Sequence, residues 1–269
     1  MGYETIILEK KENIATITLN RPNKLNAYNP PMRDELAHAI NLVDQDDEIR
    51  VVIITGTGRA FSSGADIKEG FHGYVEKREK EAGVGEDVTV GFATPGQIYG
   101  AWMNLRKPII ASLNGLAMGV GLSLALLCDI RIASETARFQ YAFTRMGAAS
   151  GMSTTYILSR LMGIGKACEF VFTSKWIDAK EAKEIGLVNQ VVPAEELAKA
   201  TYEMASSIAK LPPLAVRLAK RSLYLDMSAD QAIQAQFGNF ATNYLRGSED
   251  FKEATKAFLE KREPVFKGR

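Results

Sequence analysis

The chain has 269 residues and a mass of 29.5 kDa, which suits one large domain or one domain with a helical appendage. Its 33 Lys and Arg residues balance its 32 Asp and Glu residues, so the formal net charge is +1. This balance excludes an overall electrostatic attraction to nucleic acid or to an anionic membrane. The two cysteines exclude a disulfide framework, and the two histidines argue against a histidine-rich metal site, so we expect no bound metal. With no signal-peptide core and no apolar run long enough to span a bilayer, the sequence predicts a cytoplasmic protein.

The first part of the chain predicts strands that alternate with helices. Strands over 5–9 and 14–19 flank a polar turn and are expected to form a hairpin. Asn29 is the expected cap of a helix over 30–43, in which apolar residues recur every three or four positions. The continuous β-branched run at 51–56 is typical of a strand that is buried on both faces.

A second strand–helix–strand unit follows a long connection. Residues 109–113 predict a short buried strand, residues 119–127 an apolar helix, and residues 130–134 another strand. This order favours an α/β core. The connection over 70–100 is first charged and then glycine-rich, which is typical of a lid or of a partly disordered segment. The remainder of the chain predicts helices over 155–162, 165–173, 179–185, 195–209, 214–226, 229–245 and 249–262.

Two glycine-containing turns each follow a predicted strand, at Phe61–Ile67 and at Asn114–Gly121. Each turn could present a backbone N–H, and two such donors that converge would stabilise negative charge on a carbonyl oxygen. The second turn also opens a helix, whose first N–H groups lack partners within the helix. Glycines in turns more commonly serve only tight geometry. The dinucleotide fingerprint does not fit, because Leu124 occupies its last glycine position, and the phosphate-loop motif is absent.

Taken together, these motifs resemble the crotonase superfamily, the enoyl-CoA hydratase/isomerase family. The resemblance extends along the whole chain. It rests on Leu19-Asn20-Arg21-Pro22 with Leu25-Asn26-Ala27, Phe61 to Ile67, Lys107 to Ala111 with Asn114-Gly115, Cys128 to Ala133, Ala179 to Asn189, and the tail Phe258 to Phe266. It implies an α/β fold, with a crotonase-like spiral of ββα units over 1–200 and a C-terminal helical trimerisation region over 201–269. It also implies a homotrimer or a dimer of trimers.

The resemblance further implies a coenzyme A thioester as ligand, with coenzyme A carried by the substrate and no separate cofactor. The two oxyanion-hole amides of the family fall on the backbone N–H groups of Ala65 and Val120. Both residue types fit, because the donor is main chain. The residues that match family positions near coenzyme A are Ser63, Asp66, Ile67, Lys68, Phe258 and Lys261. In some members, the last two positions reach the site of a neighbouring subunit.

The sequence departs from the family where hydratases carry their two catalytic glutamates. Ser123 and Phe143 occupy these positions, so both general acid/base carboxylates are missing. Ser123 could orient water or a substrate carbonyl, or could simply satisfy a nearby backbone group. Tyr141 could donate a proton, or could be a packed tyrosine with a bonded hydroxyl.

Other residues offer further candidates for the missing groups. Arg145 could pair with a substrate carboxylate or form a structural ion pair. Glu69 and His72 follow the first glycine turn and could move protons or lie in solvent. Asp66 is expected to hold its loop rather than to react.

The function that follows is an enzyme of the enoyl-CoA hydratase/isomerase family that forms an enolate of an acyl-CoA thioester, stabilised in an oxyanion hole. Thioester hydrolysis or decarboxylation in the same hole stays open, as does a non-catalytic homologue that only binds acyl-CoA. Because both carboxylates are missing, we expect hydration of a simple straight-chain enoyl-CoA to be slow.

Overall fold

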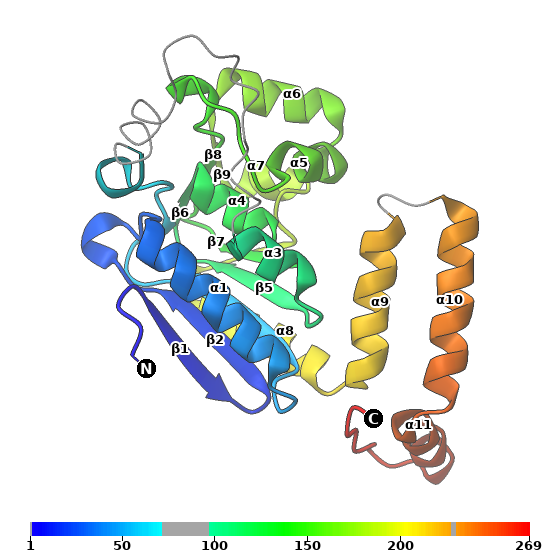
Figure 1. Ribbon diagram of the computed structural model, residues 1–269. Coiled ribbons are helices and arrows are strands. Elements are labelled where there is room, and N and C mark those ends of the chain that lie inside the picture. Colours follow the sequence, from blue (N-terminus) through cyan, green and yellow to red (C-terminus); the bar gives the residue numbers. More distant parts are fainter. Residues whose placement is uncertain (1, 72–96, 227–229) are drawn as a thin grey trace, which may run out of the picture.

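The computed structural model describes residues 2–71, 97–226 and 230–269, and shows a mixed α/β architecture beside a group of C-terminal helices (Figure 1). The larger sheet has the order β1-β2-β3-β5-β7-β10. Its strands are β1 (Ile6–Lys11), β2 (Ile14–Leu19), β3 (Val51–Gly56), β5 (Ile109–Leu113), β7 (Ile130–Ser134) and β10 (Gln190–Val192). Only the β1–β2 pair is antiparallel; the other pairs are parallel. The predicted α/β class is therefore confirmed.

Helices cover both faces of the larger sheet, which explains its continuous apolar strands. Helix α1 (Pro30–Gln45) lies in front of the sheet in Figure 1 and begins at Asn29, whose Oδ1 accepts a hydrogen bond from the Met32 N–H at 3.1 Å. Helix α8 (Leu197–Ala209) packs on β3, β5 and β7. Alternate residues of β3 belong to two different apolar clusters: Val52 lies with the α1 residues, whereas Val51 lies with α8.

A second, smaller sheet was not predicted from the sequence. Its strands are β4 (Ala60–Ser62), β6 (Leu116–Met118), β8 (Arg138–Gln140) and β9 (Trp176–Asp178), in that order. Strands β4, β6 and β8 are parallel, and β9 is antiparallel to β8. Each strand has three residues, too few to show a period of two in the sequence. Strand β4 overlaps the start of the first predicted glycine turn and β6 lies inside the second, so the turns proper are the residues that follow these strands, around Gly64 and Gly119.

The first hairpin is tighter than expected. Strand β1 extends to Lys11, which pairs with Ile14, so only Glu12 and Asn13 form the turn. Both turn residues have positive φ, 50° and 66°. Two positive φ values in a two-residue loop match the right-handed twist of the flanking strands, and the predicted four-residue polar turn was therefore wrong.

The predicted helices are present, with ends shifted by one or two residues. Short helical turns accompany them at η1 (Pro22–Lys24), the π-helix η2 (Ile67–Phe71), η3 (Thr144–Met146) and η4 (Ala194–Glu196). The remaining predicted helices are α4 (Val120–Leu126), α5 (Thr154–Met162), α6 (Ile164–Thr173), α7 (Ala179–Glu184), α9 (Pro213–Asp226), α10 (Gln231–Arg246) and α11 (Glu249–Glu260). Helix α3 (Gln97–Asn104) was not predicted, and its first residues fall in the segment 70–100 that was predicted to be a connection. Residues 72–96 of that connection lie outside the described part of the chain. In the described part of the chain, no helix has the length and apolarity needed to cross a membrane.

Helices α9 and α10 stand side by side next to the core, with α11 at one end of the pair (Figure 1). Asp129, directly before β7, ties α9 to the sheet. Its Oδ2 accepts from Lys220 Nζ at 2.9 Å and its Oδ1 accepts from the Tyr224 hydroxyl at 2.6 Å. Oδ2 also accepts from the Ile109 N–H at 2.7 Å, so one carboxylate joins β5 and α9.

Candidate active site

The smaller sheet brings the two glycine turns into contact. Strands β4 and β6 are parallel neighbours, so the turns after their carboxyl ends meet at one edge of the sheet. Gly64 and Gly119 have φ of +92° and +53°, a region that favours glycine. A Cβ on Gly64 would lie 2.8 Å from the Met118 carbonyl oxygen and 3.5 Å from the Val120 nitrogen. The two turns are therefore so close together that any side chain at position 64 would collide with the backbone of the second turn.

Two backbone N–H groups in these turns are available to a ligand. The Tyr28 N–H donates to the Gly64 oxygen at 2.7 Å, and the Asp66 N–H donates to the Tyr28 oxygen at 2.8 Å. Because backbone groups alternate in direction along an extended chain, the Ala65 N–H points away from Tyr28. Val120 is the first residue of α4, where no carbonyl of an earlier turn can accept its N–H. Within the described ranges, neither the Ala65 nor the Val120 N–H has an acceptor.

A partly buried ion pair holds the first turn. Arg21 Nη1 donates to Asp66 Oδ2 at 3.0 Å, and Arg21 Nη2 donates to Glu69 Oε2 at 3.0 Å. Asp66 Oδ1 accepts from the N–H groups of Lys68 and Glu69, at 3.2 Å each, at the start of η2. Burial alone would raise the pKa of Asp66, but these N–H donors and the guanidinium outweigh it and hold that pKa below its usual value. Asp66 is therefore an ionised anchor for the loop, as expected.

The residues expected near coenzyme A lie in two separate places. Ser63, Ile67 and Lys68 flank Ala65 on the same loop; Ile67 is 53% exposed and Lys68 is also exposed. Phe258 is 83% exposed on α11, and Lys261 is the first residue after that helix. Helix α11 lies far from η2 in Figure 1. A single chain does not bring these two groups together, and their roles in binding stay predictions.

Ser123 connects two helices beside the second turn. It is 1% exposed, and its Oγ lies 2.7 Å from Thr154 Oγ1 and 3.2 Å from the Gly119 oxygen. Thr154 Oγ1 in turn donates to the Gly151 oxygen at 2.8 Å. The Ser123 proton is therefore engaged by Thr154 or by Gly119, which favours the reading of Ser123 as a satisfied structural group. Sequence reasoning did not single out Thr154, because its partner lies on another helix.

Tyr141 and Phe143 line the other side of the second turn. The Gly119 N–H donates to the Gln140 oxygen at 3.1 Å, and a Cβ on Gly119 would lie 3.8 Å from the Ala142 Cβ. The Tyr141 hydroxyl donates to Ser150 Oγ at 2.9 Å, and the Tyr141 and Phe143 ring centroids are 5.1 Å apart. This side of the site is therefore aromatic and hydroxylic, with Ser123 and Phe143 at the two positions predicted for the family glutamates.

The other acid/base candidates are engaged or placed at the surface. Glu69 Oε2 accepts from Asn29 Nδ2 at 2.7 Å as well as from Arg21. Arg145 is exposed on η3, and His72 lies outside the described residues. Among the residues that the structure describes, no group of three or more His, Cys, Asp or Glu side chains could hold a metal ion.

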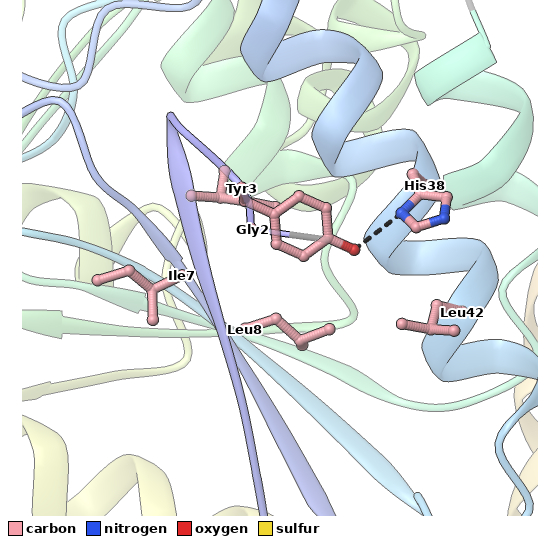
Figure 2. Close-up of a pocket in the computed structure, with 7 residues that line it drawn as sticks. Gly2, Tyr3, Ile7, Leu8, His38 and Leu42 are labelled. Carbon is pink, nitrogen blue, oxygen red and sulfur yellow. Dashed lines mark hydrogen bonds between the residues drawn. The ribbon is translucent and has the colours of Figure 1, made fainter.

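A surface pocket of about 560 Å³ lies elsewhere, between β1 and α1 (Figure 2). Figure 2 shows the Tyr3 ring directed at His38, with the hydroxyl 2.9 Å from Nδ1, and the apolar side chains Ile7, Leu8 and Leu42 nearby. None of the residues that line this pocket belongs to the glycine turns, so it is separate from the candidate active site.

Comparisons with known proteins agree with the motifs. The chain matches the enoyl-CoA hydratase/isomerase family model over residues 9–269. It is 38% identical over 263 residues to a short-chain-enoyl-CoA hydratase of Clostridium acetobutylicum, with 97% of each chain covered. It is 37% identical over 270 residues to a crotonyl-CoA hydratase of Syntrophomonas wolfei, with 99% of each covered. The crystal structure of an enoyl-CoA hydratase from Bacillus anthracis has a TM-score of 0.87 at 34% identity, covering 99% of this chain and all (100%) of that chain.

The chain therefore belongs to the enoyl-CoA hydratase/isomerase family of enzymes. The resemblance to the crotonase superfamily and the crotonase-like fold are confirmed.

Proposed function

We propose that the protein binds an acyl-CoA thioester and stabilises an enolate of its acyl group with the N–H groups of Ala65 and Val120. The observation that carries this proposal is the pair of unbonded amides in two touching turns. A thioester oxygen that accepts both hydrogen bonds can take up negative charge when a proton leaves the α-carbon or a nucleophile adds to the β-carbon. Each such donor contributes about 3 kcal/mol of transition-state stabilisation.

The loop around Ala65 supplies a place for coenzyme A in this proposal. Ser63 is half-buried beside the amide and Ile67 and Lys68 are exposed, and Lys68 offers a positive charge for a phosphate. Coenzyme A arrives as part of the substrate, so no separate cofactor is required. In a homotrimer or a dimer of trimers, Phe258 and Lys261 would contact the coenzyme A of a neighbouring subunit, which accords with their distance from the loop in one chain.

Proton transfer is the step that sets this chain apart. The hydroxyls of Ser123 and Tyr141 are engaged, and Asp66 and Glu69 are paired with Arg21. A reaction that needs two enzyme carboxylates is therefore disfavoured. We infer that protons move through the substrate itself or through water, which suits an enolate-forming step of the hydratase/isomerase type on an unusual acyl group. Thioester hydrolysis and decarboxylation would use the same two amides.

A binding protein without catalysis is the second candidate. The feature that favours it is the presence of Ser123 and Phe143 at the two positions where glutamates are expected, in a site that keeps its backbone donors.

Calorimetry with coenzyme A and a panel of acyl-CoA thioesters, followed by product analysis, tests both candidates. Turnover of any panel member supports the enzyme, whereas binding of the whole panel without turnover supports the second candidate. Failure of every thioester to bind would contradict both.

A matched pair of proline variants tests whether the Val120 N–H is an oxyanion donor. Val120→Pro removes the N–H at a helix position where proline is tolerated. Ile164→Pro is the control, because Ile164 also opens a helix after a glycine of positive φ. We expect Val120→Pro to lose about 10²-fold or more in turnover and Ile164→Pro to retain it. Full activity of a folded Val120→Pro variant would exclude the Val120 donor.

A further inference from the structure

Several hydrogen-bond donors near the second glycine turn have no acceptor among the described residues. The Tyr141 and Ser150 hydroxyls share one bond, and so do the Tyr99 and Ser153 hydroxyls, whose oxygens are 2.6 Å apart. Each pair has two hydroxyl protons and only one bond between its members. One proton in each pair is therefore left over, and no other described group accepts it.

Trp102 on α3 provides a third donor of this kind. Its side chain is 3% exposed, and its indole Nε1 is the one buried side-chain nitrogen or oxygen in the described ranges that lacks a hydrogen-bond partner. A buried donor without a partner is costly and calls for an explanation. Since an indole N–H can only donate, the missing partner must be an acceptor.

Each hydroxyl pair includes one residue of the turn over 150–154, which adjoins the oxyanion amides. The turn over 150–154 is joined to α4 by the Ser123–Thr154 bond, at 2.7 Å, three residues beyond Val120. Tyr99 joins the same turn to α3, and Trp102 follows Tyr99 by three residues, which places both on one face of that helix. The turn also has two successive non-glycine residues of positive φ, Met152 (58°) and Ser153 (53°).

We propose that this donor-rich wall, formed by Trp102, the Tyr99–Ser153 pair and the Tyr141–Ser150 pair, binds an oxygen acceptor on the acyl group of the substrate. The inference rests on the proposed acyl-CoA function and narrows its substrate class. The preferred acyl group carries a carbonyl or carboxylate oxygen away from the thioester, and an unmodified hydrocarbon chain leaves the donors unpaired. Arg145, exposed on η3 with no ion pair among the described residues, supplies the positive charge that a carboxylate would require.

Three thioesters of equal acyl length test the proposal by calorimetry: pentanoyl-CoA, levulinoyl-CoA, which adds a ketone, and glutaryl-CoA, which ends in a carboxylate. We expect the protein to bind at least one oxygenated ester about tenfold more tightly than pentanoyl-CoA, the ratio that one hydrogen bond to a buried donor gives. A preference for glutaryl-CoA alone that Arg145→Gln removes assigns a carboxylate. A preference for both oxygenated esters assigns a neutral carbonyl acceptor.

Trp102→Phe keeps an aromatic ring, deletes the donor, and is expected to reduce the preference about tenfold. Trp176→Phe is the matched control, because Trp176 lies on β9, is 37% exposed and stacks with Arg138; it should keep the preference. If Trp102→Phe does not fold, Tyr99→Phe and Ser150→Ala each reduce the same ratio. Equal affinity for all three esters, or a preference that survives loss of these donors, would overturn the inference and leave the proposed function intact. Failure of all three to bind would overturn both.

Discussion

The two sides of the candidate active site differ in the groups that form them: one side presents backbone groups and the other presents side chains. The side formed by Gly64, Ala65, Gly119 and Val120 is made of backbone, with glycines at positive φ and two unbonded amides. The opposite side is made of side chains, with Ser123 and Phe143 at the two positions where the family resemblance predicts catalytic glutamates. A backbone donor survives any side chain that its turn can accommodate, whereas a carboxylate is lost in one substitution. In the proposed function, carbonyl polarisation belongs to the backbone side and proton transfer to the side-chain side, so the two tasks can be tested separately.

Among the changes considered, disruption of the backbone side of the site should reduce turnover the most. A methyl group at Gly64 would lie 2.8 Å from the Met118 oxygen at a φ of +92°, so Gly64→Ala forces the two turns apart. We expect turnover to fall about 10³-fold, the upper end of the loss of one oxyanion donor, while the chain stays folded by circular dichroism. Gly165→Ala is the control, because nothing lies within 4 Å of the added methyl. Normal turnover in Gly64→Ala would contradict the importance of this side.

The side chains on the other side of the site predict a low rate of enoyl-CoA hydration. The wild-type protein should hydrate crotonyl-CoA at least about 10²-fold more slowly than the short-chain-enoyl-CoA hydratase of Clostridium acetobutylicum, because one positioned acid or base contributes about 10²–10⁴-fold. Loss of the enoyl absorbance measures both rates in one assay. Equal rates would show that another residue of this chain supplies the acid and the base.

Ser123 should matter for stability more than for chemistry. Ser123→Ala removes one buried hydrogen bond to Thr154 and is expected to lower the free energy of unfolding by about 1 kcal/mol. Turnover should change far less than the 10²-fold that loss of an oxyanion donor gives. Urea denaturation and initial rates measure the two effects, and Thr154→Val should behave alike. A variant with native stability and no turnover would make the Ser123 hydroxyl catalytic.

The smallest expected effect is a change in stability when Asp66, which anchors the first turn, is replaced. Asp66→Asn weakens the pairing with Arg21 and should lower the free energy of unfolding by about 1 kcal/mol near neutral pH. The folded pKa of Asp66 is depressed, so its contribution is fully present above the ordinary value of about 4 and is lost as the pH falls through the lower folded value. The difference between wild type and variant should therefore shrink below about pH 4.

Urea denaturation at several pH values measures that difference. Asp34→Asn, at an exposed ion pair, is the control. A difference that stays constant or grows in acid would contradict the assignment of Asp66 as an ionised anchor.

Local patterns in the sequence were sufficient for the longer elements except α3, which follows a segment without clear periodicity. The cap at Asn29, the buried run of β3 and the helices of the C-terminal half follow from residue spacing and capping chemistry. The turn at Glu12 and Asn13 was predicted too long, because composition marks a polar segment but does not set its register.

The sequence located the two turns of the candidate site but did not predict how they meet. The glycines showed where the two turns are, but their contact depends on β4 and β6, which are too short for a periodic pattern. The Ser123–Thr154 bond joins residues 31 positions apart, and no spacing rule predicts such a partner. The cluster of hydroxyl residues at 150–154 was the one sequence feature that indicated a polar wall. Its role depends on Tyr99, Tyr141 and Trp102, which lie on other elements and which no local pattern connects to it.

Infrared spectroscopy of a bound thioester tests the role of the two amides most directly, because it does not require the reaction to be known. With butyryl-CoA labelled with carbon-13 at the carbonyl, binding should move the C=O stretch to lower frequency than in water. Val120→Pro should reverse much of that shift, whereas Ile164→Pro should preserve it. A bound carbonyl that absorbs at the frequency of the free ester would show that Ala65 and Val120 do not polarise it.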